Sequence, residues 1–218
     1  MTRQNFDLQL AHVKERLVNL AVMVNKLQEQ SVKALADRDE ELARDVIASD
    51  QQINQAQREI EETCLTLIAS QQPVARDLRL IFSISMIGWE LERMADHAKG
   101  VAVLAQRLAD QPLLKPLIDV PRMAEIGREL LMGQVDAFMR GDVEMARNLA
   151  ARDTEVDQLN DQVFRELLLI MITDPRTITR ATYLLWVAHN LERFADRTTN
   201  IGERVVFLQT NTIVELND

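Results

Sequence analysis

Apolar residues recur along much of the chain at alternating intervals of four and three. The clearest stripe comprises Phe6, Leu10, Val13, Leu17, Leu20, Val24 and Leu27. A second stripe with the same spacing runs from Leu80 to Val101. This spacing places the apolar side chains on one face of a long helix that packs at a shallow angle against its neighbours. Together with the turn signals, this spacing predicts six long helices. They cover residues 4–36, about 39–71, about 73–101, 121–140, 142–172 and 176–211.

The chain also contains an internal repeat. Residues 50–54 (DQQIN) align with residues 153–157 (DTEVD), and Pro73 aligns with Pro175, so the period is close to 100 residues. Prolines cannot lie inside a regular helix, and a cluster of them at 112, 116 and 121 separates the two copies. We therefore predict an all-α fold of two tandem, similar three-helix bundles with pseudo-twofold symmetry, as domains 1–111 and 112–218.

One short motif occurs in both copies. Residues 91–96 read LERMAD and residues 191–196 read LERFAD, so that each copy has two acids four residues apart: Glu92 with Asp96, and Glu192 with Asp196. Like charges at this spacing lie one turn apart and destabilise a helix by roughly 0.2–0.5 kcal/mol. A cation shared by the two carboxylates would reverse the sign of that interaction, and carboxylate oxygens suit hard metal ions. By their heptad positions, both acids are expected to face away from the apolar seam.

Two carboxylates cannot complete a coordination shell of about six ligands. The preceding helix of each copy offers further candidates: Asp50, Asn54, Asp153 and Asp157. The competing interpretation is a polar helix surface, with acids solvated beside Arg93 and Arg193 and with Lys99 in reach of Asp96. The tryptophans at 89 and 186 are expected to pack between helices, and His97 to lie on the surface.

Composition narrows the function. The 218 residues carry a net charge of −9, which disfavours nucleic-acid binding as the main activity. Cys64 is the only cysteine, so an internal disulfide and a Cys-rich zinc site are excluded, and we expect Cys64 in the core. The N-terminus has no apolar signal region, and the longest apolar run, residues 167–172, is far shorter than a membrane span. The expected location is the cytoplasm.

The segments LERMADHAKGVA and NLERFADRTTNIGERVVFL, preceded by QQPVARDLR and DPRTI, resemble the PhoU family over almost the whole chain. The resemblance implies two three-helix bundles that bind metal ions, with iron expected first and manganese, magnesium or zinc as alternatives. It assigns Glu92, Asp96, Glu192 and Asp196 as ligands, with the four residues on the preceding helices as weaker candidates. Ala95 and Ala195 stand where many members have Gly, and Asn54 stands opposite the acid Asp157.

The resemblance further implies a regulatory protein and not an enzyme. PhoU proteins restrain phosphate uptake and phosphate-starvation signalling when phosphate is plentiful. The implied partners are the ATPase subunit of the phosphate ABC transporter, the phosphate sensor histidine kinase and a second copy of the chain, with membrane contact only through partners.

Two alternatives stay open. One is a ferritin-like carboxylate metal oxidase, which needs Glu-x-x-His pairs, although the residues three before His12, His97 and His189 are Gln9, Met94 and Trp186. The other is a helical adaptor without metal.

Overall fold

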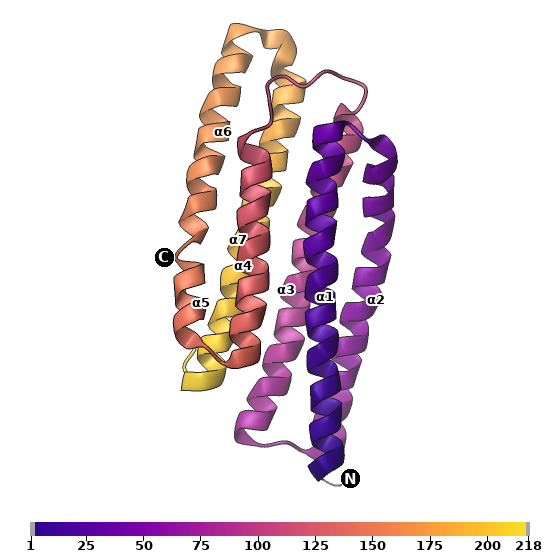
Figure 1. Ribbon diagram of the computed structural model, residues 1–218, viewed down its shortest axis with the longest axis vertical. Coiled ribbons are helices and arrows are strands. Elements are labelled where there is room, and N and C mark those ends of the chain that lie inside the picture. The colour runs from indigo at the N-terminus through magenta and orange to yellow at the C-terminus, as the bar shows by residue number, and fades with distance from the viewer. Residues whose placement is uncertain (1–2, 217–218) are drawn as a thin grey trace.

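The computed structural model describes residues 3–216. Within that range, helices are joined by turns and loops, and there is no β-strand. The helices are α1 (Arg3–Asp37), α2 (Glu40–Gln71), α3 (Ala75–Leu108), α4 (Asp119–Arg140), α5 (Val143–Ala150), α6 (Asp153–Thr173), the 3₁₀ helix η1 (Pro175–Thr177) and α7 (Ile178–Thr210). The first bundle consists of α1–α3 and the second of α4–α7, and the two lie side by side (Figure 1). The predicted all-α fold with two three-helix bundles is confirmed.

The predicted apolar stripes form the core. Leu17, Leu20 and Val24 of α1 are at most 1% exposed, as are Ile84 and Leu91 of α3. Cys64 of α2 is 1% exposed and packs in the same core, as predicted. Because most of the stabilisation of a helix in a protein comes from burying one apolar face, these stripes account for helices as long as 35 residues.

Helix starts in the two bundles use the same device. Asp39 and Asp142 each cap a helix, accepting a hydrogen bond at 2.9 Å from the backbone N–H of Leu42 and Met145, respectively. Gly141 ends α4 in the left-handed region with φ 71°, a conformation that favours glycine.

The fifth predicted helix, residues 142–172, is divided in two. A turn at residues 151–152 separates α5 from α6, and the backbone N–H of Arg152 donates to the carbonyl of Leu149 at 3.1 Å. Residues 143–173 contain neither Gly nor Pro, so the local sequence carries no strong signal for this break. Asp153 therefore becomes the first residue of α6.

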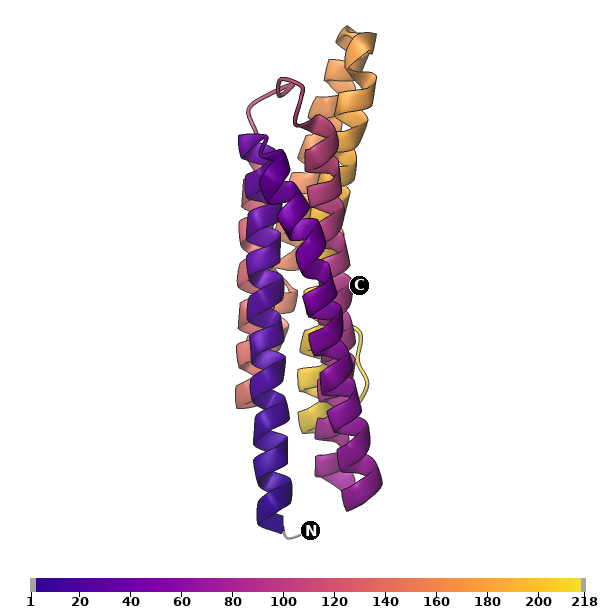
Figure 2. The ribbon, with the colours of Figure 1, turned by 90° about the vertical axis from the view of Figure 1, so that its right-hand side faces the viewer.

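The two bundles meet through equivalent helices. α3 packs against α7 and α1 packs against α4, and the helices of each pair run in opposite directions (Figures 1 and 2). Residues 109–118 connect the bundles across one end of the molecule (Figure 2). This arrangement gives the pseudo-twofold relationship that the repeat predicted.

Within residues 3–216, no helix combines sufficient length with sufficient apolarity to cross a lipid bilayer.

Candidate functional site

The first group of predicted site residues gathers between α2 and α3. Asp50 of α2 is only 5% exposed, and its Oδ2 accepts hydrogen bonds from Lys99 Nζ at 2.7 Å and from Asn54 Nδ2 at 3.2 Å. The sequence placed Lys99 within reach of Asp96, but its ammonium group hydrogen-bonds Asp50 on the neighbouring helix. Asp50, Asn54, Glu92, Asp96 and Lys99 are called the first-bundle group below.

Glu92 is partly buried within this group. Its side chain is 18% exposed, and its Oε2 has no hydrogen-bond partner among the described residues. Burial raises the pKa of Glu92, and the nearby carboxylates of Asp96 and Asp50 raise it further, while Arg93 lowers it. The prediction that both acids face away from the packed helices is wrong for this residue, because the side of α3 next to the apolar seam is covered by α2 in a three-helix bundle. Asp96 does lie on the exposed side.

The second group gathers at the equivalent place between α6 and α7. Asp153 is 7% exposed, and its Oδ1 has no hydrogen-bond partner in the described part of the chain. Glu192 also has a buried oxygen without such a partner, and its side chain is 22% exposed. Asp157 and Asp196 complete this second-bundle group.

The carboxylates of the second-bundle group repel one another. Burial, followed by the charges of Asp157, Asp196 and Glu192, raises the pKa of Asp153 from 3.8 to about 7. Burial is also the main cause of the raised pKa of Asp157 and of Glu192. These four acids are therefore close enough to act on one another strongly in a partly dry environment.

Arg193 of α7 brings positive charge to the second-bundle group, with its Nη1 2.7 Å from Asp196 Oδ2. His189 Nδ1, on the same helix, lies 3.6 Å from Glu192 Oε2. Thr199 occupies the position that corresponds to Lys99, and its hydroxyl donates to the backbone carbonyl of Asp196 at 2.6 Å.

The donor chemistry of the second-bundle group suits a hard cation. It offers four carboxylates, two of which have a buried oxygen without a hydrogen-bond partner among residues 3–216, and such oxygens are the preferred ligands of magnesium, manganese and iron. As the side chains stand, no three His, Cys, Asp or Glu residues in that range converge closely enough to enclose an ion. Coordination therefore requires at least one carboxylate to rotate toward the others.

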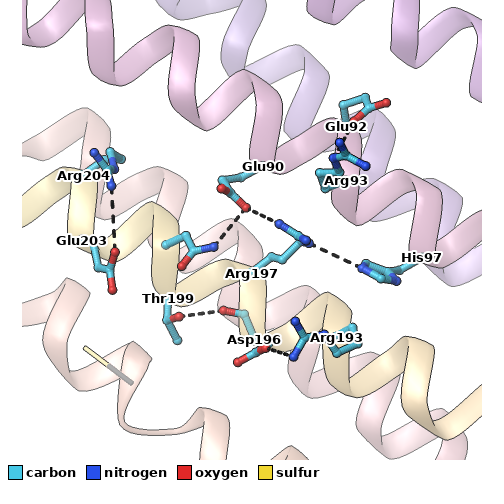
Figure 3. A network of polar contacts seen from close by, with 11 residues as sticks. Glu90, Glu92, Arg93, His97, Arg193, Asp196, Arg197, Thr199, Glu203 and Arg204 are labelled. Carbon is cyan, nitrogen blue, oxygen red and sulfur yellow. Dashed lines mark hydrogen bonds and ion pairs between the residues drawn. The ribbon is translucent and has the colours of Figure 1, made fainter. Parts of the chain in front are cut away.

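A polar network joins the two bundles beside these groups (Figure 3). Glu90 Oε2 of α3 accepts hydrogen bonds from Arg197 Nη1 at 2.9 Å and Asn200 Nδ2 at 3.1 Å, both on α7. His97 Nδ1 lies 3.2 Å from Asn190 Oδ1. His97 is half-buried at this boundary and not on the open surface as expected, and burial is the main cause of its lowered pKa. Sequence analysis missed this network, because it depends on which faces of α3 and α7 meet.

The two tryptophans do not fill the space between helices as predicted. Trp89 is 41% exposed and Trp186 is 54% exposed. Trp186 lines a groove of about 450 Å³ on the α6–α7 surface, together with Phe164, Leu185 and His189. Aromatic side chains with this exposure are more typical of contact surfaces than of cores.

Comparison with known proteins agrees with the duplicated architecture. The PhoU domain matches this chain twice, at residues 17–105 and 120–205. The chain belongs to the PhoU family. Among its curated PhoU relatives is the phosphate-specific transport system accessory protein PhoU homologue of Pseudomonas aeruginosa, which is 36% identical over 212 residues, covering 97% of this chain and 88% of the relative. The Aquifex aeolicus homologue is 37% identical over 207 residues, covering 95% of this chain and 94% of the relative.

Solved PhoU structures have the same fold. The crystal structure of PhoU from Pseudomonas aeruginosa superimposes with a TM-score of 0.90 at 36% identity, covering 95% of this chain and all of that one. The phosphate transport system regulatory protein PhoU from Streptococcus pneumoniae gives a TM-score of 0.88 at 32% identity, covering 96% of this chain and 99% of that chain. The PhoU fold therefore extends over nearly the whole molecule.

Proposed function

We propose that this chain is a negative regulator of phosphate uptake and phosphate-starvation signalling that acts by protein–protein contact. The observation that carries the proposal is its full-length similarity to proteins named as phosphate-specific transport system accessory proteins. The proposed partners are the ATPase subunit of the phosphate ABC transporter and the phosphate sensor histidine kinase, with the protein acting in the cytoplasm as a homodimer. No covalent bond is made or broken in this mechanism.

The α6–α7 surface supports a role in contact with other proteins. Phe164 and Ile172 of α6 are 51% and 70% exposed, and Trp186 of α7 is 54% exposed. Phe164 and Trp186 line one groove, and contiguous exposed apolar surface is typical of sites that other proteins cover. Truncating Phe164 and Trp186 to alanine should therefore weaken partner binding without unfolding the bundle.

The regulatory proposal is tested by complementation. The chain is expressed in a bacterium that lacks its own PhoU protein, and phosphate uptake and a phosphate-starvation reporter are measured at high phosphate. Restored repression, with co-purification of the transporter ATPase or the kinase, supports the proposal. Normal folding with neither repression nor co-purification would overturn it. Phe164→Ala with Trp186→Ala should lower co-purification, whereas Leu8→Ala, a 66% exposed residue on α1, serves as the matched control.

We further propose that a metal ion, with iron expected first and manganese, magnesium or zinc as alternatives, is held by Asp153, Asp157, Glu192 and Asp196. The buried oxygens of Asp153 and Glu192 without hydrogen-bond partners in residues 3–216 support this assignment. Metal is measured in protein purified without chelators. Asp153→Asn with Glu192→Gln should remove it, whereas Asp161→Asn, an exposed acid on the same helix, should not. Equal metal in wild type and in the double variant would rule out these ligands, and wild type without metal would favour the metal-free adaptor.

The oxidase alternative receives less support from the geometry. His97 hydrogen-bonds with Asn190 and Arg197, and His189 lies 3.6 Å from Glu192. A ferritin-like centre instead takes two Glu-x-x-His pairs that point into one core. Oxygen consumption by iron-loaded protein would distinguish the two functions, since sustained turnover supports an oxidase.

A further inference from the structure

The first- and second-bundle groups differ in charge although they occupy equivalent places. The aligned pairs are Asp50 with Asp153, Asn54 with Asp157, Glu92 with Glu192, and Asp96 with Asp196. The first-bundle group therefore has three carboxylates and an amide where the second has four carboxylates. It also contains the ammonium group of Lys99, where the second has the hydroxyl of Thr199.

Lys99 lies at the centre of the negative charge of its group. Its Nζ is 2.7 Å from Asp50 Oδ2, and the Asp50 carboxylate is 8% exposed. The hydrogen bond to Asp50 is the main cause of the raised pKa of Lys99, and the charges of Asp50, Asp96 and Glu92 raise it further. The ammonium group of Lys99 thus interacts with all three carboxylates of the group. A bound metal ion would compensate the same negative charges.

The first-bundle group nevertheless keeps free acceptor atoms. Asp50 Oδ1, Asn54 Oδ1 and Glu92 Oε2 are buried and have no hydrogen-bond partner among the described residues. The ammonium group of Lys99 has three N–H donors, but the hydrogen bond it makes within the group goes to Asp50 Oδ2, and these three oxygens receive none. Without the ammonium group of Lys99, the negative charges of Asp50, Glu92 and Asp96 would be uncompensated, and these oxygens would be available to a cation.

We infer that Lys99 is a built-in cation that closes the first-bundle group to metal, so that the second-bundle group alone takes a metal ion. This inference rests on the proposed metal site in the second bundle. The reason is direct competition: the ammonium occupies the space beside Asp50 Oδ2, and a divalent cation entering there would meet a like charge at hydrogen-bonding distance. The two halves of the molecule are consequently expected to differ in metal content despite their shared motif.

Mn²⁺ alone is the probe for this inference. Full-length protein is dialysed against MnCl₂, and manganese per chain is measured by mass spectrometry and by electron paramagnetic resonance. Lys99→Thr installs the residue of the second copy, and Lys99→Met removes the charge but keeps an apolar stem. Lys115→Met is the matched control, since Lys115 is a partly buried lysine that lies 3.6 Å from Asp119 away from both groups. Circular dichroism verifies folding of each variant.

The expected result is that Lys99→Thr and Lys99→Met bind about twice as much Mn²⁺ as the wild type, and that Lys115→Met binds the wild-type amount. The added metal should disappear when Glu92→Gln is combined with Lys99→Thr, while Glu92→Gln alone changes nothing. If Glu92→Gln alone lowers manganese as much as Glu192→Gln does, the first bundle already binds metal and the inference is wrong. Unchanged manganese in both folded Lys99 variants would also overturn it.

The same experiment separates this inference from the proposed metal site. Wild type without manganese, together with a Lys99→Thr variant that gains it through Glu92, would support the role of Lys99 and contradict the site in the second bundle. Manganese in neither protein would contradict both.

Discussion

Asn190 of α7 and His97 of α3 meet across the boundary between the two bundles, with Oδ1 3.2 Å from Nδ1. The equivalent positions in the other copy, 100 residues away, are Glu90 for Asn190 and Arg197 for His97. Glu90 Oε2 and Arg197 Nη1 lie 2.9 Å apart. The two contacts are therefore pseudo-symmetric, one with two ionised side chains and one with an amide and an imidazole. The Glu90–Arg197 pair carries the charge, and its side chains are only 19% and 26% exposed, respectively (Figure 3).

Arg197→Met should destabilise the protein because Glu90 would lose its ionic partner while its side chain is only 19% exposed. Asn200 would still donate to Glu90, so the expected loss is about 1–3 kcal/mol, between the values for exposed and fully buried pairs. Urea unfolding measures it. Arg140→Met removes the exposed pair with Asp136 and should change stability by less than about 0.5 kcal/mol. Equal effects of the two substitutions would contradict the role of the boundary pair.

Two helical glycines should respond differently to alanine. A Cβ at Gly88 would meet its nearest neighbour, Ile60, at 3.7 Å, which is ordinary contact. A Cβ at Gly100 would lie 2.8 Å from Asn190 Oδ1 and push it from His97. Gly88→Ala should therefore stabilise the protein by about 0.5–1 kcal/mol. The Gly100→Ala variant should be about 1 kcal/mol less stable than the Gly88→Ala variant, because the contact between Asn190 and His97 is disturbed. Thermal unfolding of both variants tests this; matching gains would refute the close approach at Gly100.

Asp153 should make the metal-free protein less stable as pH rises. Its pKa is about 7 in the folded protein and 3.8 ordinarily, so the folded state binds more protons between these values, and stability present at low pH is lost as pH rises toward 7. Asp153→Asn removes this loss. Its advantage over wild type should be larger at pH 8 than at pH 5, and the difference between the two pH values should be at most about 3 kcal/mol. Urea unfolding with chelator measures this.

The control for the pH experiment is Asp161→Asn, which neutralises an acid with a 75% exposed side chain on the same helix. Its stability relative to wild type should vary little between the two pH values. A pH-independent effect of Asp153→Asn would mean that the carboxylate is solvated in the folded protein.

The two capping aspartates should contribute equally to the two bundles. Asp39→Ala and Asp142→Ala each remove a 2.9 Å hydrogen bond to the first turn of a helix, and each should cost about 1 kcal/mol. Asp45→Ala changes an exposed acid inside α2 and should be nearly neutral. Chemical unfolding of the three variants suffices. A neutral Asp142→Ala would indicate that tertiary packing alone holds the start of α5.

Most of the fold follows from periodicity. The stripe from Phe6 to Leu27 predicts α1 to within one residue at each end, because a long 4-3 repeat is compatible with little else. The break at residues 151–152 was not predicted, since it depends on how α5 and α6 pack against α7 and α4. Tertiary packing leaves no mark in local composition when neither Gly nor Pro is used.

The candidate site was predicted in part. Motif repetition indicated the acids of α3 and α7, and alignment of the copies indicated those of α2 and α6, which the structure brings together in two groups. Helical spacing placed Lys99 in reach of Asp96, whose charge does act on it, but the hydrogen bond of Lys99 goes to Asp50 of another helix at 2.7 Å. Contacts between helices depend on crossing geometry, which spacing along one helix does not contain.

The pairing of α3 with α7 has a consequence for how the two halves can diverge. In a dimer of identical subunits such an interface is isologous, and every substitution enters it twice. Here the connector at residues 109–118 makes both halves one polypeptide, so His97 can differ from Arg197 and Gly100 from Asn200. Within one chain, a substitution on α3 therefore changes one side of this interface and leaves the equivalent position on α7 as it was.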